Sequence, residues 1–152
     1  MNTFKLEGKS VIITGGLGGY GLAISELILK RGGRVLLADI KSQSEAETIL
    51  QEKFKEAFEA KSVIYTKCDV TSEADFEAAF KKAEKDLVEA DGSVDILINN
   101  AGIVGEQNWQ RIYEINIVRI ISRYYYTYKL FFHFFVYFRK VCIKEYYKHS
   151  NT

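Results

Sequence analysis

Four short apolar runs divide the chain up to residue 102, and each is rich in β-branched and aliphatic residues. The runs are residues 10–15 (SVIITG), 34–40 (RVLLADI), 62–70 (SVIYTKCDV) and 94–102 (VDILINNAG). Continuous apolar runs, as opposed to alternating ones, are typical of parallel strands that are buried on both faces. The pattern therefore predicts four buried parallel strands, each ending at or beside a Gly, Asp or Asn.

Between these runs the apolar residues recur three or four positions apart, which is the period of an amphipathic helix. The predicted helices contain the apolar stripes of residues 22–28, 46–57 and 76–87, and Gly32 and Gly33 end the first of them. Strands that alternate with helices across short loops predict a parallel sheet with right-handed crossovers. The expected fold class is α/β, a doubly wound parallel-sheet Rossmann fold of which about four strands are present.

The composition changes abruptly after Asn116. Up to that residue the chain holds 14 Lys and Arg against 19 Asp and Glu, whereas residues 117–152 hold seven basic residues and one acidic residue. All 11 glycines precede residue 106, while 12 of the aromatic residues lie in the last 36 positions. We therefore predict two segments, an α/β portion over residues 1–118 and an atypical aromatic and basic tail over residues 119–152, outside the fold.

The overall composition, 47% hydrophobic and 27% charged with a net charge of +1, is typical of a soluble globular protein. So small a net charge gives no electrostatic reason to expect a nucleic acid or a membrane as a partner. Cys68 and Cys142 lie far apart without the spacing of metal ligands, so we expect reduced thiols, no metal and a cytoplasmic location. The N-terminal residues lack the apolar core of a secretory leader, which agrees with that location.

The first predicted strand ends in a glycine-rich turn, TGGLGGYG at residues 14–21, and a predicted helix follows it. Glycines let the backbone turn tightly and let a pyrophosphate approach the N–H groups at the positive end of the helix. Two registers fit the turn, GxxxGxG starting at Gly15 and GxGxxG starting at Gly16. Both registers predict a site for the phosphates of a dinucleotide.

Polar residues also follow the other predicted strands. Asp39 ends the second strand, where an acid accepts hydrogen bonds from the adenosine ribose and repels a 2′-phosphate, so NAD is favoured over NADP. Asp69 and Val70 end the third strand and are placed to flank an adenine ring, and residues 99–102 (NNAG) follow the fourth. Because such sheets bind ligands beyond the carboxyl ends of their strands, we expect these residues to share one site.

These motifs, in this order, resemble the short-chain dehydrogenase/reductase family. They are TGxxxGxG at residues 14–21, Asp39, Asp69-Val70, NNAG at residues 99–102, and Asn116. The resemblance covers residues 6–118 and selects the register that starts at Gly15. Residues 108–109 (NW) and 114–118 (EINIV) further resemble the branch of 15-hydroxyprostaglandin dehydrogenase-like and insect-type alcohol dehydrogenases. For Trp109 we favour packing against the fold over contact with a substrate.

The resemblance implies an NAD(H)-dependent oxidoreductase that acts on a secondary alcohol or ketone. In this family a Tyr assisted by a Lys relays the hydroxyl proton, a Ser positions the substrate oxygen, and an Asn at the position of Asn116 helps to hold a water–Lys relay. The residues that the resemblance assigns to the cofactor are Thr14, Gly15, Leu17, Gly19, Tyr20, Gly21, Asp39, Asp69, Val70, Asn100, Ala101 and Gly102.

The pair Tyr125 and Lys129 has the spacing of two residues on one helical face, as the family's proton-transfer pair has. Its distance from Asn116 does not fit, however. On one helix, nine residues turn the chain by about 900° and advance it by about 13 Å, so Tyr125 would point away from Asn116. The family instead places a helix, a strand with the Ser, and a loop between the Asn and the Tyr, and Ser122 lies too close to Tyr125. We therefore expect this chain to lack the catalytic Ser and Tyr-x-x-x-Lys.

Three interpretations of the tail are open. It is too short in its apolar part to span a bilayer, but a basic and aromatic segment can lie at a membrane interface. It can also cover the edge that the fourth strand leaves bare. The interpretation we favour rests on the 21 Tyr, Phe, Ile, Lys and Asn residues of positions 117–152 and on the lack of Gly, Ala and Pro there, the composition of translated A/T-rich noncoding sequence. A retained intron or a truncated gene product is then expected.

Taken together, the sequence predicts the NAD-binding portion of an oxidoreductase that does not itself catalyse the reaction. The alternative is a non-catalytic module that binds a dinucleotide and docks a partner or a membrane through its tail.

Overall fold

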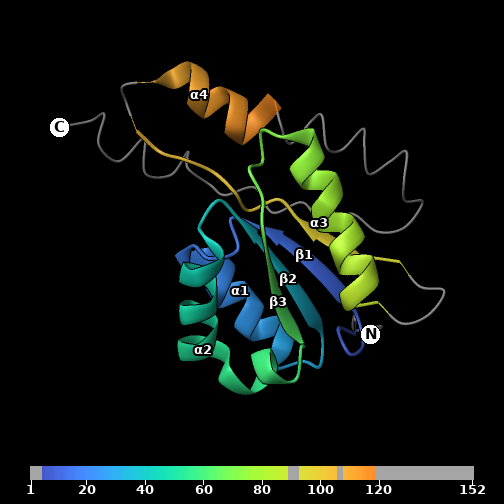
Figure 1. The fold of residues 1–152 in the computed structure, drawn as a ribbon. Coiled ribbons are helices and arrows are strands. Elements are labelled where there is room, and N and C mark those ends of the chain that lie inside the picture. Colours follow the sequence, from blue (N-terminus) through green and yellow to red (C-terminus); the bar gives the residue numbers. More distant parts are fainter. Residues whose placement is uncertain (1–4, 89–92, 106–107, 119–152) are drawn as a thin grey trace.

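The structure is a computed structural model, and it describes residues 5–88, 93–105 and 108–118 (Figure 1). The tail over residues 119–152, with Ser122, Tyr125 and Lys129, lies outside the described residues. The predictions made for that tail therefore concern residues outside the described ranges.

The described residues form a four-stranded parallel sheet, as the apolar runs predicted. The strands are β1 (Ser10–Thr14), β2 (Arg34–Asp39), β3 (Val63–Lys67) and β4 (Ile96–Ile98), and their order in the sheet is β3-β2-β1-β4. All three pairings are parallel. Since β1 lies between β2 and β4, the direction in which the chain adds strands reverses at β1. In doubly wound sheets the ligand crevice lies at this switch point, beyond the carboxyl ends of the strands.

Helices cover both faces of the sheet (Figure 1). The helices α1 (Gly19–Leu29) and α2 (Gln43–Glu59) lie on one face, and α3 (Glu73–Asp86) lies on the other. A short helix, α4 (Trp109–Tyr113), continues into a π-helical turn over Glu114–Val118 and lies beyond the end of the sheet where the strands finish. The described part of the chain thus matches the predicted α/β layout.

The two layers explain why the strands are apolar without interruption. Ile13 and Leu37 belong to the core cluster that packs under α1 and α2, whereas their neighbours Ile12 and Leu36 belong to the cluster under α3. All four side chains are fully buried. Because successive strand residues point to opposite faces, the central positions of a strand must be apolar in succession to fill both cores.

Local hydrogen bonds set where two of the helices begin. Ser42 caps α2 and forms a capping box with Glu45: its hydroxyl accepts from the Glu45 N–H at 3.3 Å, and its own N–H donates to the Glu45 carboxylate at 2.9 Å. Ser72 caps α3 by accepting from the Asp75 N–H at 3.2 Å. These caps satisfy N–H groups that the first helical turn leaves without partners. They fix the chain just after β2 and β3, close to the crevice.

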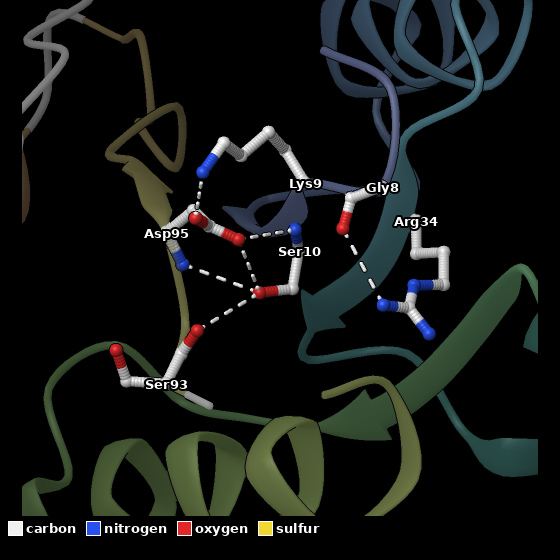
Figure 2. Close-up of polar contacts among 6 residues, drawn as sticks. All are labelled: Gly8, Lys9, Ser10, Arg34, Ser93 and Asp95. Carbon is white, nitrogen blue, oxygen red and sulfur yellow. Dashed lines mark hydrogen bonds and ion pairs between the residues drawn. The ribbon is translucent and has the colours of Figure 1, made fainter. Parts of the chain in front are cut away.

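A polar clasp joins the amino ends of β1 and β4, at the opposite end of the sheet from the crevice. We define it as Lys9, Ser10 and Asp95, and Figure 2 shows the Asp95 carboxylate between the other two. Lys9 Nζ contacts Asp95 Oδ1 at 2.6 Å, while the Ser10 N–H and hydroxyl donate to Asp95 Oδ2 at 2.8 Å and 3.0 Å. The clasp holds β4 in register with β1, although 85 residues separate Ser10 from Asp95 in the chain.

Candidate functional site

A cavity of about 610 Å³ opens beyond the carboxyl ends of the strands. It brings together the glycine-rich loop after β1, the ends of β2 and β3, the NNAG loop after β4, and α4 with the residue before it. Its described lining consists of Gly15, Gly18, Asp39, Ile40, Cys68, Asp69, Val70, Thr71, Asn100, Ala101, Gly102, Ile103, Asn108, Gln110, Arg111, Glu114 and Ile115.

The glycines of the glycine-rich loop differ in what a side chain at each position would contact. Gly15 has a φ of +60°, and a Cβ there would lie 2.8 Å from the Ala101 Cα. A Cβ at Gly21 would lie 2.6 Å from the carbonyl oxygens of Gly15 and Gly16, so α1 packs directly onto the turn. At Gly19 a Cβ would meet nothing within 4 Å. The protein itself therefore requires Gly15 and Gly21, whereas the space beside Gly19 is open to a ligand.

Thr14 and Asn100 hold the two loops of the crevice together. Thr14 is buried, and its hydroxyl oxygen accepts hydrogen bonds from the N–H groups of Asn100 and Ala101, both at 3.1 Å. The Asn100 side-chain amide donates to the carbonyls of Thr14 and Gly15, each at 3.0 Å. Thr14 therefore acts by positioning the NNAG loop against the glycine-rich turn.

Asp39 stands at the rim of the cavity and is tied to the glycine-rich loop. Its Oδ2 accepts from the Leu17 N–H at 3.0 Å, and its Oδ1 accepts from the Lys41 N–H at 3.4 Å. The side chain is half-buried, which leaves part of the carboxylate accessible. Leu17 thus contributes its backbone to the position of Asp39, while its side chain is buried in the core.

Tyr65 supports the turn after Asp39, a role that the sequence analysis missed. Its hydroxyl donates to the Asp39 carbonyl at 2.9 Å and also contacts the Lys41 carbonyl. Burial, followed by the nearby Asp39, Cys68 and Glu45, raises the pKa of Tyr65 to about 12, so the hydroxyl keeps its proton and stays a donor. A Tyr one strand away from an acid gives no pattern in the sequence, because only the pairing of β2 with β3 brings the two together.

Asp69 and Val70 line the cavity just after β3. The Asp69 carboxylate accepts from the N–H and the hydroxyl of Thr71 at 2.7 Å and 2.8 Å, which shapes the turn into α3. The Asp69 N–H donates to Asp75 at 2.9 Å. Asp69 therefore stabilises this turn in addition to lining the cavity.

Asn116 fastens the NNAG loop to the π-helical turn after α4. Its Oδ1 accepts from the Ile103 N–H at 3.0 Å, and its Nδ2 donates to the Ile103 carbonyl at 2.9 Å. A Cβ at Gly102 would lie 3.0 Å from Asn116 Oδ1, so a glycine is needed for this close approach. In the described structure the Asn116 side chain holds the loop and does not line the cavity.

The structure thus divides the predicted cofactor residues into two groups. Those that line the cavity are Gly15, Asp39, Asp69, Val70, Asn100, Ala101 and Gly102. Those that stand beside it without lining it are Thr14, Leu17, Gly19, Tyr20 and Gly21. The prediction that Trp109 is a packing residue was wrong, since its side chain is 67% exposed. The lining from α4 was not predicted either, because it depends on how α4 crosses the crevice.

No group of three or more His, Cys, Asp or Glu side chains in the described ranges is placed to hold a metal ion. Among the same residues, no helix has the length and apolar character that crossing a membrane requires.

Comparison with known proteins decides the family. Residues 9–130 match the family described as short chain dehydrogenase. This chain belongs to the short-chain dehydrogenase family. The match to this oxidoreductase family ends at residue 130 and so includes Tyr125 and Lys129, which lie outside the described residues.

Curated short-chain dehydrogenases give the same assignment. The NAD(+)-dependent 15-hydroxyprostaglandin dehydrogenase of Macaca fascicularis is 34% identical over 122 residues, which are 79% of this chain and 43% of the relative. The L-2,3-butanediol dehydrogenase of Corynebacterium glutamicum is 36% identical over 122 residues, covering 74% of this chain and 44% of the relative. The chain therefore spans less than half the length of these relatives.

Solved short-chain dehydrogenase structures share the fold. The 3-ketoacyl-(acyl-carrier-protein) reductase of Brucella melitensis, complexed with NADH, is 31% identical with a TM-score of 0.64, and the match covers 85% of this chain and 51% of that one. A short-chain dehydrogenase/reductase of Burkholderia phymatum in complex with NAD is 23% identical with a TM-score of 0.70, covering 89% and 50%. The match at lower identity supports the fold alone.

Proposed function

We propose that this chain is the NAD(H)-binding unit of a short-chain dehydrogenase for secondary alcohols or ketones, and that it binds the cofactor without turning a substrate over. The observation that carries the proposal is a single cavity lined by both Asp39 and Gly18, the residue next to the open space at Gly19. A dinucleotide needs both features, since its pyrophosphate must approach the backbone closely and its ribose needs an acceptor.

The amino end of α1 is suited to the pyrophosphate. Its N-cap residue, Gly18, provides no side-chain hydrogen bond to the first turn, and that turn contains no acidic residue. The positive end of the helix dipole and its N–H groups are therefore available to an anion. Gly15 and Gly18, which line the cavity, keep that approach clear of side chains.

Asp39 favours NAD(H) over NADP(H). The Leu17 N–H holds its carboxylate at 3.0 Å beside the glycine-rich loop. This position supports a role in accepting hydrogen bonds from the ribose of a dinucleotide bound along that loop. A carboxylate accepts hydrogen bonds from ribose hydroxyls but repels a 2′-phosphate. The 15-hydroxyprostaglandin dehydrogenases that resemble this chain carry NAD(+) in their names, which agrees with this choice.

The chemistry of the family needs more than the cofactor. When bound, the nicotinamide ring accepts or supplies the hydride. In this chain Asn116 holds the loop that borders the crevice, but no Ser, Tyr and Lys occur at the family's spacing from Asn116. We infer that no residue of this chain carries the substrate's proton, and that it binds NAD(H) without turnover.

Fluorescence titration with NADH and NADPH tests the cofactor. We expect NADH to bind about tenfold more tightly than NADPH, and Asp39→Asn to remove most of that preference, because one repulsion between charges at the rim is lost. Asp86→Asn, an exposed acid at the end of α3, is the matched control and should leave the preference intact. Failure to bind either nucleotide would refute the proposed function, and equal binding of both would refute the choice of NAD(H).

Turnover is tested separately with a panel of secondary alcohols and NAD⁺. We expect no NADH to form. Alcohol oxidation that Tyr125→Phe abolishes would show that the chain is catalytic after all.

Sequencing the transcript across the codons for residues 118–123 tests the origin of the tail, since a dominant message that encodes residues 119–152 would exclude a retained intron.

A further inference from the structure

Tyr65 lies on β3, beside β2, and its ring is buried in the core under α1 and α2. Its register partner on β2 is Leu37, two residues before Asp39. From this position the Tyr65 hydroxyl donates to the Asp39 carbonyl at 2.9 Å and also contacts the Lys41 carbonyl. One hydroxyl group therefore contacts the carbonyls on both sides of Ile40, in the turn that leads from β2 to α2.

This hydroxyl holds a part of the turn that the sheet does not hold. The pairing of β2 with β3 ends at Asp39 opposite Lys67, so Lys41 lies beyond the paired residues. The Asp39 carbonyl also accepts from the Cys68 N–H at 2.8 Å and would keep that bond without the hydroxyl. Removing the hydroxyl should therefore release Lys41 while leaving the two strands paired.

The position of the Asp39 carboxylate depends on Lys41. The Lys41 N–H donates to Asp39 Oδ1 at 3.4 Å, and the Leu17 N–H donates to Asp39 Oδ2 at 3.0 Å. Lys41 is thus held at its carbonyl by Tyr65 and contacts the carboxylate through its N–H. Because 3.4 Å is longer than the usual N–H···O distance, a small shift of Lys41 is enough to break that bond.

We propose that the Tyr65 hydroxyl is a positioning group for cofactor selection: by holding Lys41, it keeps the Asp39 carboxylate where a ribose can donate to it and a 2′-phosphate is repelled. The inference rests on the proposed function, which assigns the ribose to Asp39. Tyr65 itself is outside the described lining of the cavity, so it acts through Asp39 and not by touching the nucleotide. Burial, with the nearby Asp39, raises the pKa of Tyr65 to about 12, so the hydroxyl stays a donor at physiological pH.

Tyr65→Phe tests the proposal, since it removes the hydroxyl and keeps the ring in the core. Fluorescence titration of the full chain with NADH and NADPH gives the ratio of the two affinities for each variant. We expect the preference for NADH to fall from about tenfold to about threefold, a loss in the range that one neutral hydrogen bond supplies. Tyr113→Phe is the matched control and should keep the full preference, because Tyr113 is exposed and lies outside the described cavity lining.

A double variant tests whether Tyr65 acts through Asp39. In a chain that already carries Asp39→Asn, Tyr65→Phe should change the ratio of the two affinities by less than about 1.5-fold, because two residues that act as one unit do not have additive effects. A fall of about threefold in both backgrounds would overturn the route through the carboxylate.

Amide hydrogen exchange, measured by NMR without nucleotide, tests the positioning independently of binding. We expect Tyr65→Phe to speed exchange of the Leu17 N–H, which donates to Asp39, by about threefold relative to the Gly18 N–H, which donates to the Gly15 carbonyl at 3.1 Å. An equal change at both amides, or none at either, would show that the hydroxyl does not position the carboxylate.

The possible outcomes separate the two proposals. A wild type that binds neither nucleotide would overturn the proposed function, and the role of Tyr65 in cofactor selection with it. A wild type that prefers NADH, with the same preference in Tyr65→Phe, would overturn the role of Tyr65 alone. Equal weakening of NADH and NADPH in Tyr65→Phe would also overturn it, because the hydroxyl would then support binding without selecting the cofactor.

Discussion

At the scale of single residues, the glycines of the loop after β1 show how one motif serves two purposes. Gly15 combines a φ of +60° with a Cβ position 2.8 Å from the Ala101 backbone, so any side chain there is both strained and in collision. Gly19 begins α1 with open space where its Cβ would stand. The first glycine is thus a requirement of the fold, whereas the second has no such requirement and, in the proposed function, leaves room for the ligand.

Alanine at these two positions should therefore separate stability from binding. Gly15→Ala should lower the free energy of unfolding by at least about 2 kcal/mol, because left-handed strain and a backbone collision add. Gly19→Ala should leave stability unchanged or raise it by up to about 1 kcal/mol through helix propensity. It should nevertheless weaken NADH binding about tenfold or more, since the new methyl group occupies the space that a pyrophosphate needs.

Urea denaturation and NADH titration of the two variants check this prediction. Equal NADH affinity for Gly19→Ala and the wild type would show that the open space is not part of the cofactor site. In that case the ligand would have to bind in a part of the cavity away from Gly19.

At the scale of elements, α1 and α2 end in the same way with different residues. After α1, the Gly33 N–H donates to the Ile28 carbonyl and the Gly32 N–H to the Leu29 carbonyl, both at 3.0 Å. After α2, Ser62 and Lys61 make the equivalent bonds to Ala57 and Phe58 at 2.8 Å and 3.1 Å. This is the Schellman arrangement, whose left-handed position normally holds glycine. Gly32 occupies it after α1 with a φ of +75°, but Lys61 occupies it after α2 with a φ of +56°.

Exchanging the residue type at the two helix ends should change stability in opposite directions. Lys61→Gly should raise the free energy of unfolding by about 0.5–1 kcal/mol because it removes left-handed strain. Gly32→Ala should lower it by about 1–2 kcal/mol because it introduces that strain. Urea denaturation measures both, and a loss of stability in Lys61→Gly would mean that contacts of the Lys61 side chain outweigh the strain.

At the scale of the whole molecule, the two ends of the sheet have different functions. The carboxyl ends of the strands surround the cavity, where polar groups are left for a ligand. The amino ends are fastened by the clasp of Lys9, Ser10 and Asp95 (Figure 2). Because β4 is short and only Ile96–Ile98 pair with β1, this clasp supplies a large part of the polar contact between the two strands.

The clasp makes stability depend on pH. Burial tends to raise the pKa of Asp95, but the hydrogen bonds from Lys9 and Ser10 and the Lys9 charge outweigh it and hold the pKa below its usual value. A carboxylate whose pKa is lowered by folding contributes stability above the unfolded pKa of about 3.9. That contribution is lost as the pH falls through the lower folded pKa.

Asp95→Asn should therefore destabilise the protein by about 1–3 kcal/mol at neutral pH, since hydrogen bonds to a charged group are lost. The difference from the wild type should shrink as the pH falls below about 3.9, where the wild-type carboxyl also becomes neutral. Urea denaturation across this pH range measures the effect. Glu77→Gln, which removes an exposed pair with Lys81, is the control and should change stability by no more than about 0.5 kcal/mol. A difference that stays constant with pH would show that Asp95 acts by its shape alone.

Much of the fold could be predicted from the sequence, because the relevant signals are local. Continuous apolar runs gave the parallel strands, and the apolar stripe of residues 46–57 gave the helix that the structure shows as α2. The prediction for Trp109 was wrong, because a large aromatic residue beside a family-like motif does not reveal whether a neighbour covers it. The hydrogen bond from Tyr65 to the turn after Asp39 could not be predicted from the sequence either, because it depends on the pairing of β2 with β3.

The sequence by itself determined which chemistry the crevice can hold: a glycine-rich turn before a helix, an acid after the second strand, and amides after the fourth. These residues follow strand ends, and parallel strands bring their ends to one edge whatever the details of packing. Only the tertiary structure decided what faces them. The position of α4 across the crevice, and with it the placing of Arg111 in the cavity wall, depends on the path of the NNAG loop and on the hold of Asn116 on Ile103. Contacts between segments that are distant in the sequence leave no periodic pattern in the chain, so they cannot be predicted from such a pattern.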